Sequence, residues 1–169
     1  MFFFLNILKK IVQILHSNDS PSQVAWGVVL GSFMGLAPFF CLHKLVILLM
    51  ILLLNVNMGA AFLSVLIFSI VGVLTDPLAN LIGYSLLVKT PGLTGMWTSL
   101  YNAPVVPFTR FSNTIVLGSL VLNFVFLVPL FVFAKKFIVY YRNNLAQKVE
   151  KWKIMKLLKL SAVTRFYSN

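Results

Sequence analysis

The feature that most constrains this chain is an apolar run over residues 111–134, FSNTIVLGSLVLNFVFLVPLFVFA, which contains no charged residue. A helix needs about 20 residues, at ~1.5 Å of rise each, to cross the hydrocarbon core of a bilayer. We therefore expect residues 111–134 to form a transmembrane helix, with a kink near its end at Pro129. Lys135 and Lys136 follow directly and mark where this helix leaves the hydrocarbon.

Composition extends this expectation to the whole chain. Of its 169 residues, 60% are hydrophobic and 10% are charged, whereas roughly a quarter are charged in soluble domains. We expect a single all-α integral membrane protein, built from short re-entrant or broken helices and one long C-terminal transmembrane helix that continues into a basic cytoplasmic helix. Residues 1–17 would form an interfacial helix, residues 18–134 the membrane domain, and residues 135–169 a basic tail.

The N-terminal segment, residues 2–16, is apolar except for a polar stripe at helical spacing. The pattern is typical of an amphipathic helix in the membrane interface, with its lysines at the headgroups. The first turns of a spanning helix are the alternative. No signal-peptide cleavage pattern follows, so we expect the N-terminus to be retained. The stripe consists of Asn6, Lys9, Lys10, Gln13 and His16.

Short apolar pieces fill the region between these two segments. Ser20 can cap a helix that begins at Pro21, runs to about residue 37 and stops at Pro38. Further helices are predicted over residues 42–57, 58–75 and 77–88. Pieces this short survive at membrane depth only when they pack against protein or line a cavity. The simplest arrangement makes 21–57 a re-entrant hairpin and 58–88 one broken crossing.

Residues 89–110 are rich in proline and glycine, which predicts a loop. Four of its residues have helical spacing and predict a short turn that dips into the membrane interface. They are Met96, Trp97, Leu100 and Tyr101.

Positive charge predicts the orientation. The tail from residue 135 holds nine lysines and arginines against one glutamate, so the tail and the N-terminus with Lys9 and Lys10 should both face the cytoplasm. Lys153, Lys156 and Lys159 fall on one side of a predicted helix, as expected for binding to anionic lipid headgroups. Because the tail is tethered to a membrane, we expect lipids, and not nucleic acid, to be its partners.

Three glycines, Gly27, Gly31 and Gly35, form two consecutive GxxxG steps. Such a face lets another helix approach backbone to backbone, which is how helices associate in lipid. The partner helix could belong to this chain or to another protein, and an internal partner is the simpler expectation.

Asp76 stands between two apolar runs, and Lys44 is the only other charged residue from position 24 to position 88. An isolated charge at mid-membrane costs about 2.5–3.5 kcal/mol. Asp76 could cap a helix that begins at Pro77, could pair with Lys44, or could form an ion or substrate site with Lys44 and His43. A weak repeat, SPSQVAWG at 20–27 and DPLANLIG at 76–83, favours broken helices. Asn55, Asn57, Asn80 and Asn123 are expected as caps or interhelical hydrogen bonds.

Catalysis has little support in the sequence. We find no nucleophile–base–acid set, no paired carboxylates, no metal-ligand spacing and no phosphate-binding glycine loop. The single cysteine, Cys41, is expected to be a buried, unreactive thiol. We therefore expect no catalytic residues, no cofactor and no metal, and a protein that is not an enzyme.

Residues 17–90 resemble a bacterial membrane family known as domain of unknown function 2062. The similarity rests on Ser20-Pro21, Ala25, Gly27, Gly31, Gly35, Pro38, Leu42, the NVN at 55–57 and an acidic or amide residue before Pro77. It departs at His43 and Asp76, where the family often has Gln and Asn. The resemblance implies a small inner-membrane domain without an established activity. Some members are joined to glycosyltransferases, and stand-alone members tend to be encoded beside a larger envelope protein.

These features together predict a non-catalytic, multi-pass subunit of the bacterial inner membrane. We expect it to anchor or complete a cell-envelope complex, with lipid transport as a favoured task and a larger envelope protein as its partner. The alternative is a small carrier or flippase that uses Asp76, Lys44 and His43 as an intramembrane polar site.

Overall fold

The computed structural model describes residues 2–38 and 40–146, and every regular element within them is helical. The longer elements are α1 (Phe2–Leu15), α2 (Pro21–Leu36), α3 (Leu42–Leu53), α4 (Met58–Leu87), α5 (Thr94–Tyr101) and α6 (Thr114–Tyr140). Short 3₁₀ turns lie at Pro91–Leu93 and Val106–Thr109, and a π-helical turn at Tyr141–Leu145 prolongs α6. The predicted basic helix with Lys153, Lys156 and Lys159 falls outside the described residues.

The predicted start of α2 is confirmed in detail. Ser20 Oγ accepts a hydrogen bond from the Gln23 backbone N–H at 3.2 Å, and Gln23 Oε1 accepts one from the Ser20 N–H at 2.7 Å. Pro21 occupies the first turn, where its missing N–H has no helical partner to lose. The helix ends at Leu36, immediately before the Ala37–Pro38 pair, as predicted.

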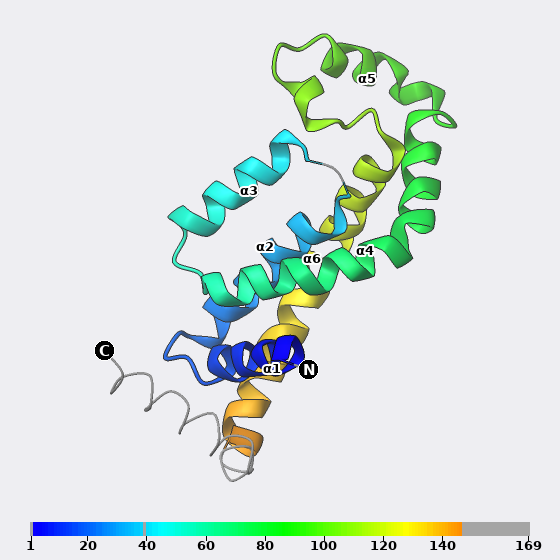
Figure 1. Cartoon of the computed structure of the whole chain (residues 1–169). Helices are drawn as coiled ribbons and strands as arrows, with labels where there is room; N and C mark the ends of the chain where they lie inside the picture. Colours follow the sequence, from blue (N-terminus) through cyan, green and yellow to red (C-terminus); the bar gives the residue numbers. More distant parts are fainter. Residues whose placement is uncertain (1, 39, 147–169) are drawn as a thin grey trace.

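The prediction that Pro77 begins a new helix, with Asp76 as its cap, is wrong. Both residues lie inside α4, whose N-cap is Asn57: its Oδ1 accepts a hydrogen bond from the Ala60 N–H at 2.6 Å. The residues before Pro77 are already helical, so the N–H groups after it find carbonyl partners in the preceding turn and need no cap. An internal proline removes one hydrogen bond and bends the helix, and α4 does change direction between its two halves (Figure 1).

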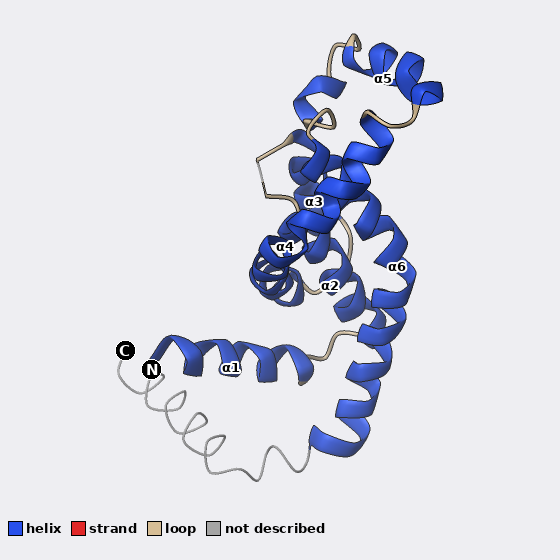
Figure 2. Ribbon diagram, turned by 90° about the vertical axis from the view of Figure 1, so that its right-hand side faces the viewer, coloured by secondary structure: helices blue, strands red, loops and turns tan. Residues whose placement is uncertain are grey.

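Helix α2 lies at the centre of the structure and packs against α4, α6 and, at its edge, α3. Most of its residues are buried, whereas α3 buries only Ile47 and Ile51. Helix α1 lies across one end of the molecule, roughly at right angles to α6 (Figure 2). The α5 region, residues 89–110, lies at the opposite end (Figure 1).

Two helices are long and apolar enough to cross a membrane, α4 and α6 with its π-helical extension. Only 22% of the most apolar window of α4 and 28% of that of α6 are buried inside the protein. The outer sides carry large apolar side chains, among them Ile70 and Phe133, each 70% exposed. Soluble monomers rarely expose apolar surface on this scale, and by length and composition α4 and α6 could span a membrane. The sequence predicted one such long helix, and the structure adds α4.

Two other predicted segments differ in length from the structure. Helix α3 was expected over residues 42–57 but ends at Leu53, because residues 54–57 form the turn that leads into the Asn57 cap. The predicted turn in residues 89–110 is present as α5. Its Trp97 packs inward: the indole N–H donates to the Leu86 carbonyl at 3.0 Å, and the ring stacks on Phe111 with centroids 5.8 Å apart.

Candidate functional site

The three residues of the predicted intramembrane polar site lie on two different helices. His43 and Lys44 stand in the first turn of α3, and Asp76 lies in the interior of α4; all three are half-buried. The part of the chain that the structure describes shows no ion pair between Asp76 and Lys44, and no hydrogen bond to the Asp76 carboxylate. The predicted structural ion pair is therefore not formed among the described residues.

His43 lies at the wall of an apolar cavity beside α2. Its Nε2 lies 3.4 Å from the Cys41 sulfur, and Cys41 is buried, as predicted. The imidazole contributes to the wall of a cavity of about 380 Å³ between α2, α3 and α6, which Trp26 and Phe33 also line. Asp76 does not line this cavity.

Polar side chains do meet at the crossing of α2, α4 and α6. Ser32 Oγ lies 3.1 Å from Asn123 Oδ1, and the Asn123 amide donates to the Ser119 carbonyl at 2.9 Å. Ser32 and Asn123, together with Thr75 of α4, line a second cavity of about 470 Å³ whose other walls are apolar. Thr75 and Leu78, which flank Asp76 and Pro77 in the chain, both line it, so this cavity lies at the bend of α4.

The glycine face of α2 packs inside the chain. A Cβ atom on Gly27 would lie 2.6 Å from the Asn57 carbonyl oxygen, and one on Gly35 would lie 2.7 Å from Phe68 Cβ. A Cβ on Gly31 would collide with the carbonyl oxygen of Ala61. Such distances leave room only for hydrogen, so α2 and α4 touch backbone to backbone, and the hydroxyl of Ser64 donates to the Val28 carbonyl at 2.7 Å across the contact.

A second close contact, between α4 and α6, was not predicted. Cβ atoms on Gly83 and Gly118 would collide with the backbones of Thr114 and Ala79, respectively. The hydroxyl of Thr114 also donates to Asn80 Oδ1 across this contact. The weak repeat contained a signal for it, because Gly27 and Gly83 hold matching places in the two copies and both sit at helix crossings. The repeat also predicted two capping residues. Ser20 caps α2, whereas Asp76 lies inside α4.

Arg142 makes a polar junction that the sequence did not reveal. Its Nε donates to the Leu15 carbonyl at 3.0 Å and its Nη1 to the Asp19 carbonyl at 2.7 Å. The Asn57 amide in turn donates to Ser17 Oγ and to Asp19 Oδ2. These hydrogen bonds join the end of α1 and the loop after it to the N-cap of α4 and to the π-helical turn after α6. The sequence feature that could have indicated this junction is Asp19, one of only three acidic residues, in the polar stretch HSNDSP.

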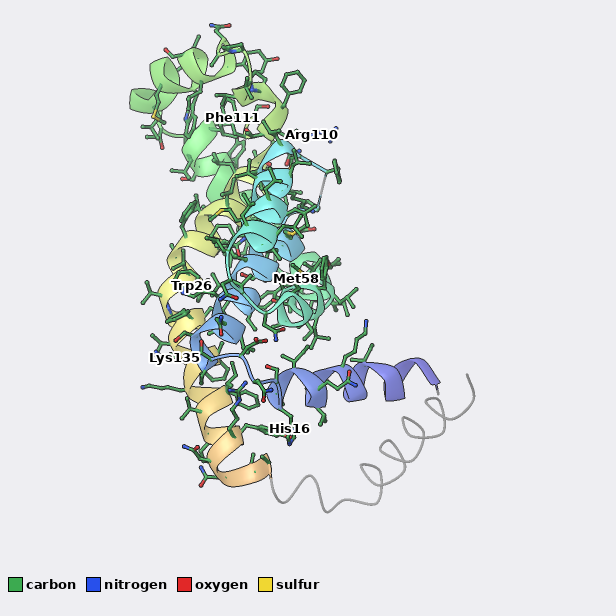
Figure 3. The ribbon with its side chains drawn as sticks, turned by 90° about the vertical axis from the view of Figure 1, so that its left-hand side faces the viewer. His16, Trp26, Met58, Arg110, Phe111 and Lys135 are labelled. Atoms are coloured by element: carbon green, nitrogen blue, oxygen red, sulfur yellow. The ribbon has the colours of Figure 1, made fainter. Side chains whose placement is uncertain are left out.

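The predicted headgroup lysines within the described residues gather at this same end. Lys9 and Lys10 lie in α1, and Lys135 and Lys136 lie towards the C-terminal end of α6. Figure 3 shows Lys135 and His16 in the half of the molecule opposite Arg110 and Phe111. Lys10, Lys135 and Lys136 are exposed.

Comparison with known proteins settles the family. The family model described as "Uncharacterized protein conserved in bacteria (DUF2062)" matches residues 6–146, which is most of the chain. The chain belongs to the DUF2062 family. The DUF2062 match reaches well beyond residues 17–90, which carry the sequence resemblance, and includes most of α1, the α5 region, α6 and Arg142.

An uncharacterized protein of Treponema pallidum (strain Nichols) is similar to this chain. It is 26% identical to this chain over 145 residues, which cover 86% of this chain and 89% of the relative. No solved structure matches this DUF2062 chain significantly.

Proposed function

We propose that this chain is a non-catalytic subunit of the bacterial inner membrane that anchors or completes a cell-envelope complex, with lipid transport as the favoured task of that complex. Both termini face the cytoplasm in this proposal, and α2–α3 form a re-entrant hairpin. The positive charge of Lys10, Lys135 and Lys136, all at one end, supports that orientation under the positive-inside rule.

The observation that carries the proposal is the uncovered outer face of α3. This helix has 12 residues, about 18 Å at ~1.5 Å per residue, which is too short to cross the hydrocarbon. Its ends carry backbone groups that lipid cannot satisfy, so a short helix at membrane depth needs protein around it. Within the described residues, α3 packs mainly on α2 along one side and leaves Leu49 and Leu53 49% and 82% exposed. A larger membrane protein would cover this face.

Site-specific photo-crosslinking tests the proposal. A photoreactive amino acid placed at Leu49 or Leu53, in the full chain expressed in its own bacterium, should give one discrete protein adduct. The same probe at Val125, which is exposed on α6, serves as the matched control and should give lipid adducts alone. Purification of a monomer with no protein adduct at either α3 position would rule out the subunit proposal.

The rival proposal, a small carrier or flippase, draws its support from one cavity. Ser32, Thr75 and Asn123 line about 470 Å³ at the bend of α4, next to Asp76, and transporter sites often form at broken helices. Lys44 and His43 do not line that cavity. Of the three predicted site residues, Asp76 is therefore the one that lies beside it. We therefore favour the subunit.

A further inference from the structure

A groove of about 800 Å³ runs between α1 and the start of α4. Figure 3 shows the beginning of α4, marked by Met58, above α1. Its apolar floor includes Phe62, Leu63 and Leu66 of α4. One wall is polar, and the volume is within the range typical of ligand pockets, about 300–1,000 Å³.

The polar wall consists mainly of hydrogen-bond donors. Lys10, Gln13 and Ser17 line the groove at spacings of three and four residues, which places them on one side of α1 and the turn that extends it. The described residues offer no hydrogen-bond or ion-pair partner to the side chains of Lys10 and Gln13. Ser17 Oγ accepts from Asn57 Nδ2 at 3.4 Å and from Arg142 Nη2 at 3.5 Å, so its own proton is left to donate.

The charge of this wall suits an anion. Lys10 supplies a cation, and the nearby Asp19 carboxylate is already bound by the Asn57 amide. Arg142 and Asn57 hold Ser17 and the loop around it, so the Ser17 hydroxyl is positioned before any ligand arrives. An ammonium group with two neutral donors is a suitable set for the oxygens of a phosphate diester.

An apolar cavity of about 310 Å³ adjoins the groove. The two share Ile14 and Leu63 in their walls, and the cavity extends between α1, α2, α4 and α6 past Phe133 and Phe137. Its one polar lining residue, Ser64, already donates to the Val28 carbonyl. A polar mouth beside an apolar chamber fits a molecule with an anionic head and a hydrocarbon tail.

We infer that this groove binds one anionic glycerophospholipid from the bilayer. The phosphate lies against Lys10, Gln13 and Ser17, and one acyl chain enters the cavity past Leu63. The inference rests on the membrane location in the proposed function, but it does not depend on a protein partner.

Native mass spectrometry of the purified full chain in detergent, titrated with phosphatidylglycerol or phosphatidylcholine, tests the inference. One phosphatidylglycerol should bind more tightly than phosphatidylcholine. Lys10→Gln should weaken phosphatidylglycerol binding about fivefold, the usual effect of one basic residue at an anionic headgroup. Lys89→Gln, which removes the same charge from an exposed site outside the groove, in the turn after α4, should leave binding unchanged.

Leu63→Trp, which enlarges a side chain in the wall that groove and cavity share, should weaken binding of both lipids more than Lys10→Gln does, and Ser17→Ala gives a milder polar variant. Equal binding of the two lipids by the native chain, or equal losses in Lys10→Gln and Lys89→Gln, would overturn the site. Such a failure leaves the crosslinking result at α3 untouched, so the lipid site and the subunit role fail separately.

Discussion

Ser32 Oγ of α2 lies 3.1 Å from Asn123 Oδ1 of α6, and this hydrogen bond joins two buried side chains 91 positions apart. The Ser32 hydroxyl also lies 2.7 Å from the Val29 carbonyl of its own helix, so it retains an acceptor if Asn123 is lost. The Asn123 amide has the Ser119 carbonyl, 2.9 Å away, as its acceptor. The pair thus connects the central helix to the long helix. The Ser32 hydroxyl has two possible acceptors, whereas Asn123 Oδ1 and Nδ2 each have one partner among the described residues.

Asn123→Leu keeps the side-chain volume and removes this interhelical bond. We expect it to lower the free energy of unfolding by about 1 kcal/mol, the typical worth of a hydrogen bond between membrane helices. Unfolding of the detergent-solubilised chain by a denaturing detergent measures the change. Asn55→Leu, at an exposed position, is the control and should alter stability much less. Equal stability of Asn123→Leu and the native chain would show that the bond contributes nothing.

Gly118→Ala places a methyl group against the backbone of Ala79 where α6 crosses α4. The two backbones must move apart, and we expect a loss of about 3 kcal/mol in the free energy of unfolding, at the upper end for overpacking. Gly95→Ala in α5, where a Cβ meets nothing within 4 Å, should be neutral or slightly stabilising because alanine favours helix. Equal effects of the two substitutions would mean that α4 and α6 do not touch at this crossing.

Arg142→Gln should release α1 from the end of α6. The guanidinium donates to the Leu15 and Asp19 carbonyls, and hydrogen bonds from charged donors contribute about 1.5–3 kcal/mol each. Hydrogen exchange in residues 2–20 should therefore speed up at least tenfold, while α2 and α6 change little. Arg142→Lys should fail to restore protection, because an ammonium group cannot reproduce the planar fork of donors.

The control for Arg142→Gln is Lys136→Gln, which removes a positive charge from an exposed position on the same helix. It should leave exchange in residues 2–20 unchanged. Full protection of α1 in Arg142→Gln would mean that the apolar contact of Leu15 with α6 holds the helix without the arginine.

Asp76→Asn should leave the folded protein as stable as the native chain or more stable. The described residues give the carboxylate no hydrogen bond that Asn would lose, and the substitution removes a charge that is costly at membrane depth. Thermal unfolding in detergent measures this. A clear loss of stability would mean that the Asp76 charge is bound by a group outside the described residues or by a ligand, and would strengthen the carrier proposal.

Local rules predicted those parts of the structure that are decided within a few residues. The Ser20–Gln23 cap, the stop before Pro38 and the close packing at Gly27, Gly31 and Gly35 each follow from short patterns. A membrane helix with a glycine face needs a partner, but the pattern does not say which one, and the structure supplies α4.

Sequence-based prediction failed at residues whose conformation or contacts depend on distant parts of the chain. Pro77 looks like a helix start because it follows Asp76, yet the apolar residues before it continue the helix and the bend is accommodated by packing on α6. Arg142 reads as one more basic residue in a basic tail, and its contacts with Leu15 and Asp19 span more than 120 positions. No pattern of neighbouring residues indicates a pairing of that kind.

Collision rates of a spin label at Val125 test the lipid-facing arrangement most directly. Val125 is 63% exposed on α6, and the label is attached in a Cys41→Ser background after reconstitution into bilayers. If this face lies in hydrocarbon, the label should collide with oxygen far more often than with a water-soluble nickel chelate, whereas a label at Ser99 in α5 should show the reverse. A label at Val125 that meets the nickel chelate as often as the one at Ser99 would place α6 in water.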